Sequence, residues 1–161
     1  MASNELLGGY LSDHLAGSAV GVELAEKLAS SNEGTPFGTA VAAVAEEIKE
    51  DKETLKGLVE RLGIGKSPVK QAAGWVFEKV TRLRFNQQLT GSGELTRLLE
   101  TETLSLGIEG KLAMWQALKV IDGLDAELGP ADFDGLIVRA RRQRETLEPH
   151  RLEAAAKAFS P

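Results

Sequence analysis

Apolar residues recur every three or four positions along most of the chain, which is the spacing of one face of an α-helix. The alternation with a period of two that is typical of strands is nearly absent. Turn-forming segments such as SSNEGTP (30–36) and TGSG (90–93) separate the periodic segments. Pro149 lies inside the last of these, where we expect it to kink the helix or end it early. The pattern predicts four long helices and one shorter helix, over residues 5–31, 36–62, 68–88, 93–127 and 130–158.

The connections between these helices predict how they are arranged. The first two long helices are joined by a short turn, as are the last two, and short connections make neighbouring helices antiparallel. The middle connection is about 30 residues long and contains the helix expected over 68–88, which at 1.5 Å per residue covers about 30 Å. That length returns the chain along the bundle, so the second and third long helices are expected to be parallel. We therefore predict one all-α domain over residues 1–161, a ferritin-like four-helix bundle with a long helical crossover.

The composition narrows the class of protein. The 161 residues contain no cysteine, which excludes disulfides, thiolate metal sites and cysteine nucleophiles. They contain only two histidines, which leaves little room for a histidine-rich metal centre. A formal net charge of −5 disfavours nucleic acid as a partner, because phosphate binding needs an excess of Lys and Arg. No apolar run reaches the length of a membrane span, and the first residues lack the pattern of a signal peptide. We expect a cytoplasmic protein that binds neither membranes nor nucleic acids.

Ionisable residues lie within the apolar stripe of every long helix. At 100° per residue, Glu102 and Glu109 are central to the stripe that also contains Leu98 and Leu106. Because an isolated buried charge is too costly, these side chains are expected to pair with cations or with a metal. The expected buried cluster consists of His14, Glu47, Asp51, Glu102, Glu109, Arg144 and Arg151.

The expected topology divides this cluster into two levels along the bundle. Each level contains one arginine, which binds carboxylates well through its forked guanidinium. The first level holds His14, Asp51, Glu109 and Arg144, and the second, about two turns away, holds Glu47, Glu102 and Arg151.

Three segments, YLSDHLAGSAVGVELAEKLA, AEEIKEDKETL and LLETETLSLGIEGKLAMWQAL, resemble those of small bacterial ferritin-like helical-bundle proteins of uncharacterised function. Ferritin-like di-metal proteins carry a Glu on each of two helices and a Glu-x-x-His on each of the other two. This chain contains no Glu-x-x-His, and its nearest equivalent is Glu47-x-x-Glu50. The resemblance implies a ferritin-like bundle, and the missing motif favours a non-catalytic protein with a binding or structural role.

Several interpretations of the cluster remain open. In the first, carboxylates and arginines form buried ion pairs that set the helix register without a ligand. In the second, the protein is an oxidase or metal-storage protein that binds one or two iron or manganese ions. In the third, the bundle is rotated and some of these side chains face water. A small-molecule site between the helices, around His14 and Glu109, is a further alternative. The residues proposed as metal ligands are Glu47, Asp51, Glu102, Glu109 and His14.

The third long helix has a second apolar face, opposite Glu102, which also includes Lys111. A helix that is apolar on both sides must be covered on both sides. We expect the helix over 68–88 to provide one cover, and a homodimer through the third long helix or through this crossover helix to add to it. The residues of this second face are Leu104, Ile108, Trp115 and Leu118.

Overall fold

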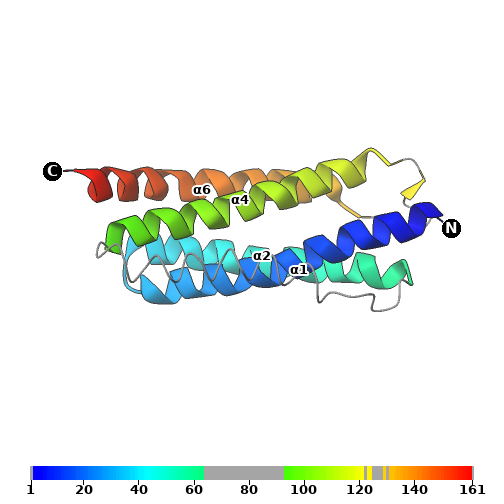
Figure 1. The fold of residues 1–161 in the computed structure, drawn as a ribbon, viewed down its shortest axis with the longest axis horizontal. Coiled ribbons are helices and arrows are strands. Elements are labelled where there is room, and N and C mark those ends of the chain that lie inside the picture. The colour runs from blue at the N-terminus through cyan, green and yellow to red at the C-terminus, as the bar shows by residue number, and fades with distance from the viewer. Residues whose placement is uncertain (1, 64–92, 122, 125–128, 130, 161) are drawn as a thin grey trace.

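The computed structural model describes residues 2–63, 93–121, 123–124, 129 and 131–160. These residues form an all-helical structure without strands (Figure 1). The helix expected over 68–88, and with it the expected crossover, lies outside the described residues. The four helices are α1 (Ala2–Ser31), α2 (Pro36–Arg61), α4 (Gly93–Lys119) and α6 (Phe133–Phe159).

The turn between α1 and α2 is built by the residues that suggested it in the sequence. Gly34 has a φ of 78°, a left-handed conformation that other residues rarely adopt. The Thr35 hydroxyl then caps α2 by accepting a hydrogen bond of 3.0 Å from the amide of Gly38. A side chain at Gly38 would collide with the carbonyl oxygen of Asn32, so a glycine is needed here. Pro36 occupies the first turn, where its missing N–H costs nothing.

The structure corrects the expected end of α4 and the expected start of α6. Helix α4 ends at Lys119 rather than near 127, because the amides of Val120 and Ile121 bond three residues back and tighten the last turn. Helix α6 begins at Phe133 rather than 130, where the Asp132 carboxylate accepts a hydrogen bond from the amide of Gly135. Pro149 does not end α6, which continues to Phe159. Its exposed position lets water hydrate the backbone carbonyl that the proline leaves without a donor.

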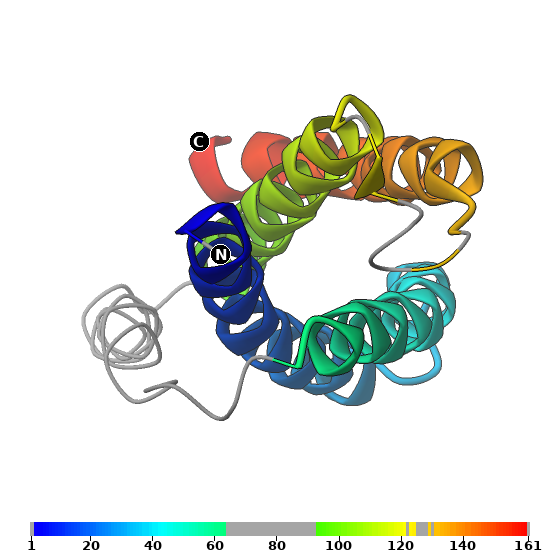
Figure 2. The same cartoon turned by 90° about the vertical axis from the view of Figure 1, so that its right-hand side faces the viewer.

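The helices form a four-membered ring in which every neighbouring pair is antiparallel. In Figure 1, α1 and α6 run in one direction, and α2 and α4 run in the other. Helix α4 packs most extensively on α6, and α1 on α2, while α1–α4 and α2–α6 contacts close the ring. Helices α2 and α4 therefore lie on a diagonal and are parallel, which is the direction expected from the sequence (Figures 1 and 2).

The core of the bundle uses the face of α4 that was expected to be the second, outer one. Leu104 and Trp115 are 2% and 0% exposed. Glu102 is half-buried, Glu109 is exposed, and Leu106 beside them is 73% exposed. The expectation that both glutamates lie on the buried face of α4 is therefore wrong. The bundle itself covers the Trp115 face, so this face does not require a second copy of the chain.

Long apolar stretches are absent from the helices that the structure describes, and none of these helices is long and apolar enough to cross a membrane.

We predict that Leu104→Ala lowers the free energy of unfolding by about 2–4 kcal/mol, because it leaves a cavity in the core. Leu106→Ala is the matched control on the same helix and should change it by less than about 0.5 kcal/mol, because Leu106 is already in water. Chemical denaturation of both variants measures the difference. Equal losses in the two variants would contradict the assignment of the buried face.

Candidate functional site

A network of polar side chains lies inside the bundle between α2, α4 and α6, and Asp51 on α2 is its most deeply buried charge. The Asp51 side chain is 1% exposed and forms ion pairs with Lys111 on α4 and Arg139 on α6. The amide nitrogen of Gln143, also on α6, donates to its Oδ2 at 3.3 Å. Helices α4 and α6 therefore both supply positive charge to one carboxylate of α2.

Gln143 connects this ion pair to the surface. It is 1% exposed, and its Oε1 accepts a hydrogen bond of 2.6 Å from the Lys111 ammonium. Its amide nitrogen donates to Glu47 Oε2 at 3.0 Å, and Glu47 in turn accepts from Arg142 at 2.6 Å. Because Arg139 and Gln143 are four residues apart, both point from the same face of α6 towards α2.

The charges of the network balance. Burial lowers the pKa of the Lys111 ammonium below its ordinary value, and the carboxylate of Asp51 partly opposes this shift. Arg139 also pairs with Glu50 at 2.8 Å. The three carboxylates are Asp51, Glu47 and Glu50, and the three cations are Lys111, Arg139 and Arg142. Removal of one member from the interior of such a network leaves an uncompensated buried charge.

The basic segment RARRQR (139–144) is largely neutralised by neighbouring helices. Arg139 and Arg142 pair with carboxylates of α2, and Arg144 pairs with Glu109 of α4. This segment therefore holds helices together and offers little free positive charge to an acidic ligand.

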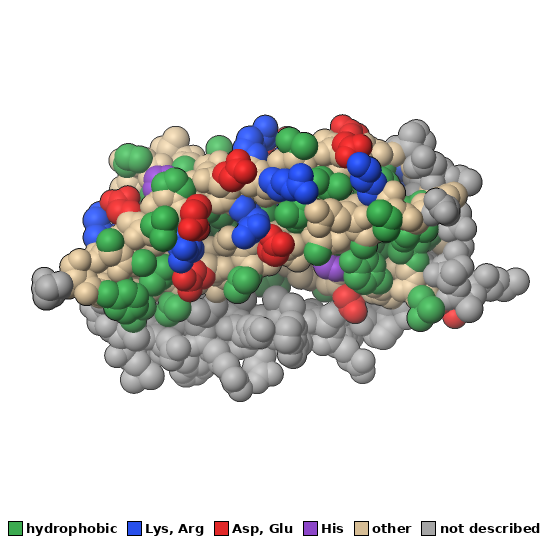
Figure 3. Space-filling view, turned by 90° about the horizontal axis from the view of Figure 1, so that it is seen from above, with side chains coloured by type: hydrophobic (Ala, Val, Ile, Leu, Met, Phe, Trp, Pro, Cys, Tyr) green, Lys and Arg blue, Asp and Glu red, His purple; other side chains and the backbone are tan. Residues whose placement is uncertain are grey.

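Two of the expected ion pairs form, but at the surface. Glu102 pairs with Arg151 at 3.1 Å and Glu109 pairs with Arg144, which are the partners expected from their levels. The glutamate side chains are 41% and 50% exposed, so these pairs lie on the outer rim between α4 and α6. Figure 3 shows acidic and basic side chains side by side along this part of the surface.

His14 does not join the network. It is half-buried on α1, where its ring makes an edge-to-face contact with Tyr10 at a centroid distance of 4.7 Å. Burial lowers the pKa of His14, and the neighbouring Asp13 carboxylate partly opposes this shift.

The residues proposed as metal ligands are not brought together. Within the described part of the chain, no three His, Asp or Glu side chains are placed to hold one metal ion. Glu47 and Asp51 lie close enough to share the amide of Gln143, but the nearest groups to them are cations. A positively charged lysine and arginine disfavour a further cation at this position.

Sequence reasoning missed five members of the network: Glu50, Lys111, Arg139, Arg142 and Gln143. Lys111 shares a helix face with Leu104, Ile108 and Trp115, and this lone charge on an apolar face was the available signal. Lys111 was not included in the expected cluster, because its face of the helix was expected on the outside of the bundle. The 139/143 spacing of Arg139 and Gln143 is ordinary on an amphipathic helix and gave no separate signal.

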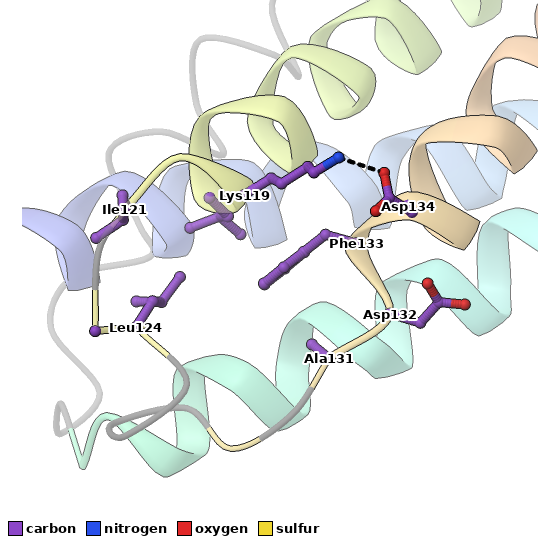
Figure 4. Close-up of a pocket in the computed structure, with 9 residues that line it drawn as sticks. Lys119, Ile121, Leu124, Ala131, Asp132, Phe133 and Asp134 are labelled. Atoms are coloured by element: carbon purple, nitrogen blue, oxygen red, sulfur yellow. Dashed lines mark hydrogen bonds and ion pairs between the residues drawn. The ribbon is translucent and has the colours of Figure 1, made fainter.

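A cavity of about 390 Å³ lies apart from the network, where α4 ends and α6 begins. Leu118, Leu124 and Phe133 contribute apolar side chains to it (Figure 4). Lys119 and Asp134 at its edge pair with each other at 2.5 Å. Because Asp132 also lines the cavity and already caps α6, the charged groups here are used within the fold.

Comparison of the chain with protein-family models, with curated protein sequences and with solved structures finds no match.

We predict that Asp51→Asn lowers the free energy of unfolding by about 3–5 kcal/mol, because Lys111 then loses its carboxylate inside the bundle and Arg139 keeps only its pair with the exposed Glu50. Glu109→Gln is the matched control, and loss of its exposed pair with Arg144 should cost about 1 kcal/mol or less. Urea denaturation at neutral pH measures both values. A loss for Asp51→Asn no larger than that of the control would show that the network does not hold the bundle together.

The lowered pKa of His14 makes stability depend on pH. Between its folded pKa and its unfolded value of about 6.5, the unfolded chain binds more protons, so stability falls as the pH drops through this window. His14→Gln should remove this part of the acid sensitivity. Unfolding free energies of both proteins between about pH 7 and 5 test the prediction, and parallel curves for the two proteins would refute it.

Proposed function

We propose that this chain is a non-catalytic helical-bundle protein of ferritin-like architecture, with a binding or structural role, in which the chain's own cations stand where a metal site would lie. The observation that carries the proposal is the pairing of Asp51 with both Lys111 and Arg139 inside the bundle. The antiparallel neighbours and the parallel diagonal pair α2 and α4 support the ferritin-like arrangement.

A second lysine–carboxylate pair supports a structural role for buried charge. Glu100 on α4 is 7% exposed and pairs with Lys27 on α1. Among the described residues, Asp51 and Glu100 are the buried carboxylates, and each is bound by a lysine from a different helix. Such pairs contribute little net stability, but they favour one alignment of the helices over others.

Metal analysis tests whether the protein binds a metal ion from solution. We expect the purified protein to contain no stoichiometric iron or manganese, because Lys111 and Arg139 already neutralise Asp51. Saturating Fe(II) or Mn(II) should leave the melting temperature unchanged, since an ion that binds only the folded state would raise it. Elemental analysis and calorimetry, with and without a chelator, provide the measurements.

The alternative, an iron or manganese oxidase or storage protein, makes the opposite prediction. One or two ions per chain, lost in Asp51→Asn and retained in Glu109→Gln, would establish that the network binds metal and would overturn the proposal. Metal retained in both variants would place a metal site elsewhere in the chain and equally contradict a metal-free bundle.

A further inference from the structure

Three buried side-chain atoms in the described part of the protein have no hydrogen-bond partner among its atoms: Asp51 Oδ1, Arg139 Nε and Trp115 Nε1. A terminal nitrogen of Arg139 forms an ion pair with Asp51 Oδ1 but lacks the geometry of a hydrogen bond. An unsatisfied buried polar group costs about 1–3 kcal/mol, so an unpaired atom of this kind commonly marks a bound water or ion.

The residues that carry these three atoms are linked by direct contact or by position on a helix. Asp51 and Arg139 are in direct contact, and Trp115 lies one helical turn after Lys111, the second partner of Asp51. Residues four apart on a helix have Cβ atoms about 5–6 Å apart on the same face. Trp115 is 0% exposed and packs against Phe133 at the start of α6, at a ring distance of 6.3 Å. The unpaired indole N–H therefore lies inside the bundle, on the face of α4 that also carries Lys111.

The chemistry of the three atoms selects the molecule that satisfies them. The indole N–H and the Nε–H of arginine only donate, whereas the Asp51 carboxylate oxygen only accepts. Their common partner must both accept and donate hydrogen bonds. It must also be neutral, because the carboxylates and cations of the network already balance. A water molecule has these properties, and buried waters typically make about three such bonds.

We propose that ordered water, as one molecule or two, completes the network by accepting from Trp115 Nε1 and Arg139 Nε and donating to Asp51 Oδ1. The Trp115 side of the network is thus an internal hydration site between α2, α4 and α6. The site links the otherwise apolar aromatic contact of Trp115 to the buried charges.

Nuclear magnetic resonance of the full chain labelled with ¹⁵N tests the proposal. The chain contains two tryptophans, so the indole N–H signal that disappears in Trp115→Phe belongs to Trp115. If Trp115→Phe does not fold, Trp75→Phe leaves the Trp115 signal as the only one. We expect this N–H to show a magnetisation-transfer peak to a long-lived water molecule. In a high-resolution crystal structure, that water should lie within hydrogen-bond distance of Nε1.

Two results would overturn the proposal. In one, the indole N–H shows no contact with water and no water density lies beside it. In the other, the crystal structure shows Nε1 donating to a protein carbonyl or carboxylate. Asp51→Asn supplies a further check, because the amide changes the hydrogen-bonding partner of the water and should shift the Trp115 indole signal. An unshifted signal would show that the Trp115 site and the network are independent.

Discussion

Burial of the Asp51 carboxylate is the constraint on which the arrangement of α2, α4 and α6 depends. A carboxylate that is 1% exposed must be neutralised by groups that approach it inside the bundle. Lys111 and Arg139 do so only when their helices stand at one height relative to α2. A shift of α4 by one turn, about 5.4 Å, would separate Lys111 from Asp51 and leave both charges unpaired in the core. Apolar packing alone penalises such a shift less, because after the shift one leucine occupies the place that another leucine held.

Helix α4 is the element through which this constraint reaches the whole bundle. It contributes Lys111 to the pair with α2 and Glu100 to the pair with Lys27 of α1. Its outer rim is joined to α6 by Glu102 and Glu109. The Asp51–Lys111 pair is specific because both side chains are largely shielded from solvent, whereas the exposed rim pairs are screened and worth little. Register is therefore determined in the interior, and the rim follows it.

The sequence predicted the four long helices and their directions, but it predicted the wrong buried face for α4. In α1, Leu11, Ala25 and Leu28 stand at helical spacing, and all three are fully buried. In α4, two opposite faces are apolar at helical spacing, so periodicity cannot choose between them. The bundle buries the face with Trp115 and a single lysine, and hydrates the face with two glutamates. Glu102 and Glu109 nevertheless pair with the arginines expected at their own levels, because such pairing depends on height and helix direction rather than on burial. The expected burial of Asp51 is confirmed, but its partners Lys111 and Arg139 were not predicted, because the face of α4 that carries Lys111 was expected on the outside.

The identity of the buried cations bears on what the bundle can do. A lysine ammonium is covalently held, carries a single charge and has no open coordination position, so it neither exchanges with solution nor activates a bound oxygen. Arg139 and Gln143 also contact the Asp51 carboxylate. The charge of Asp51 is therefore balanced by groups of the chain itself. The network therefore favours a function that relies on a rigid helical surface over one that relies on a reactive interior.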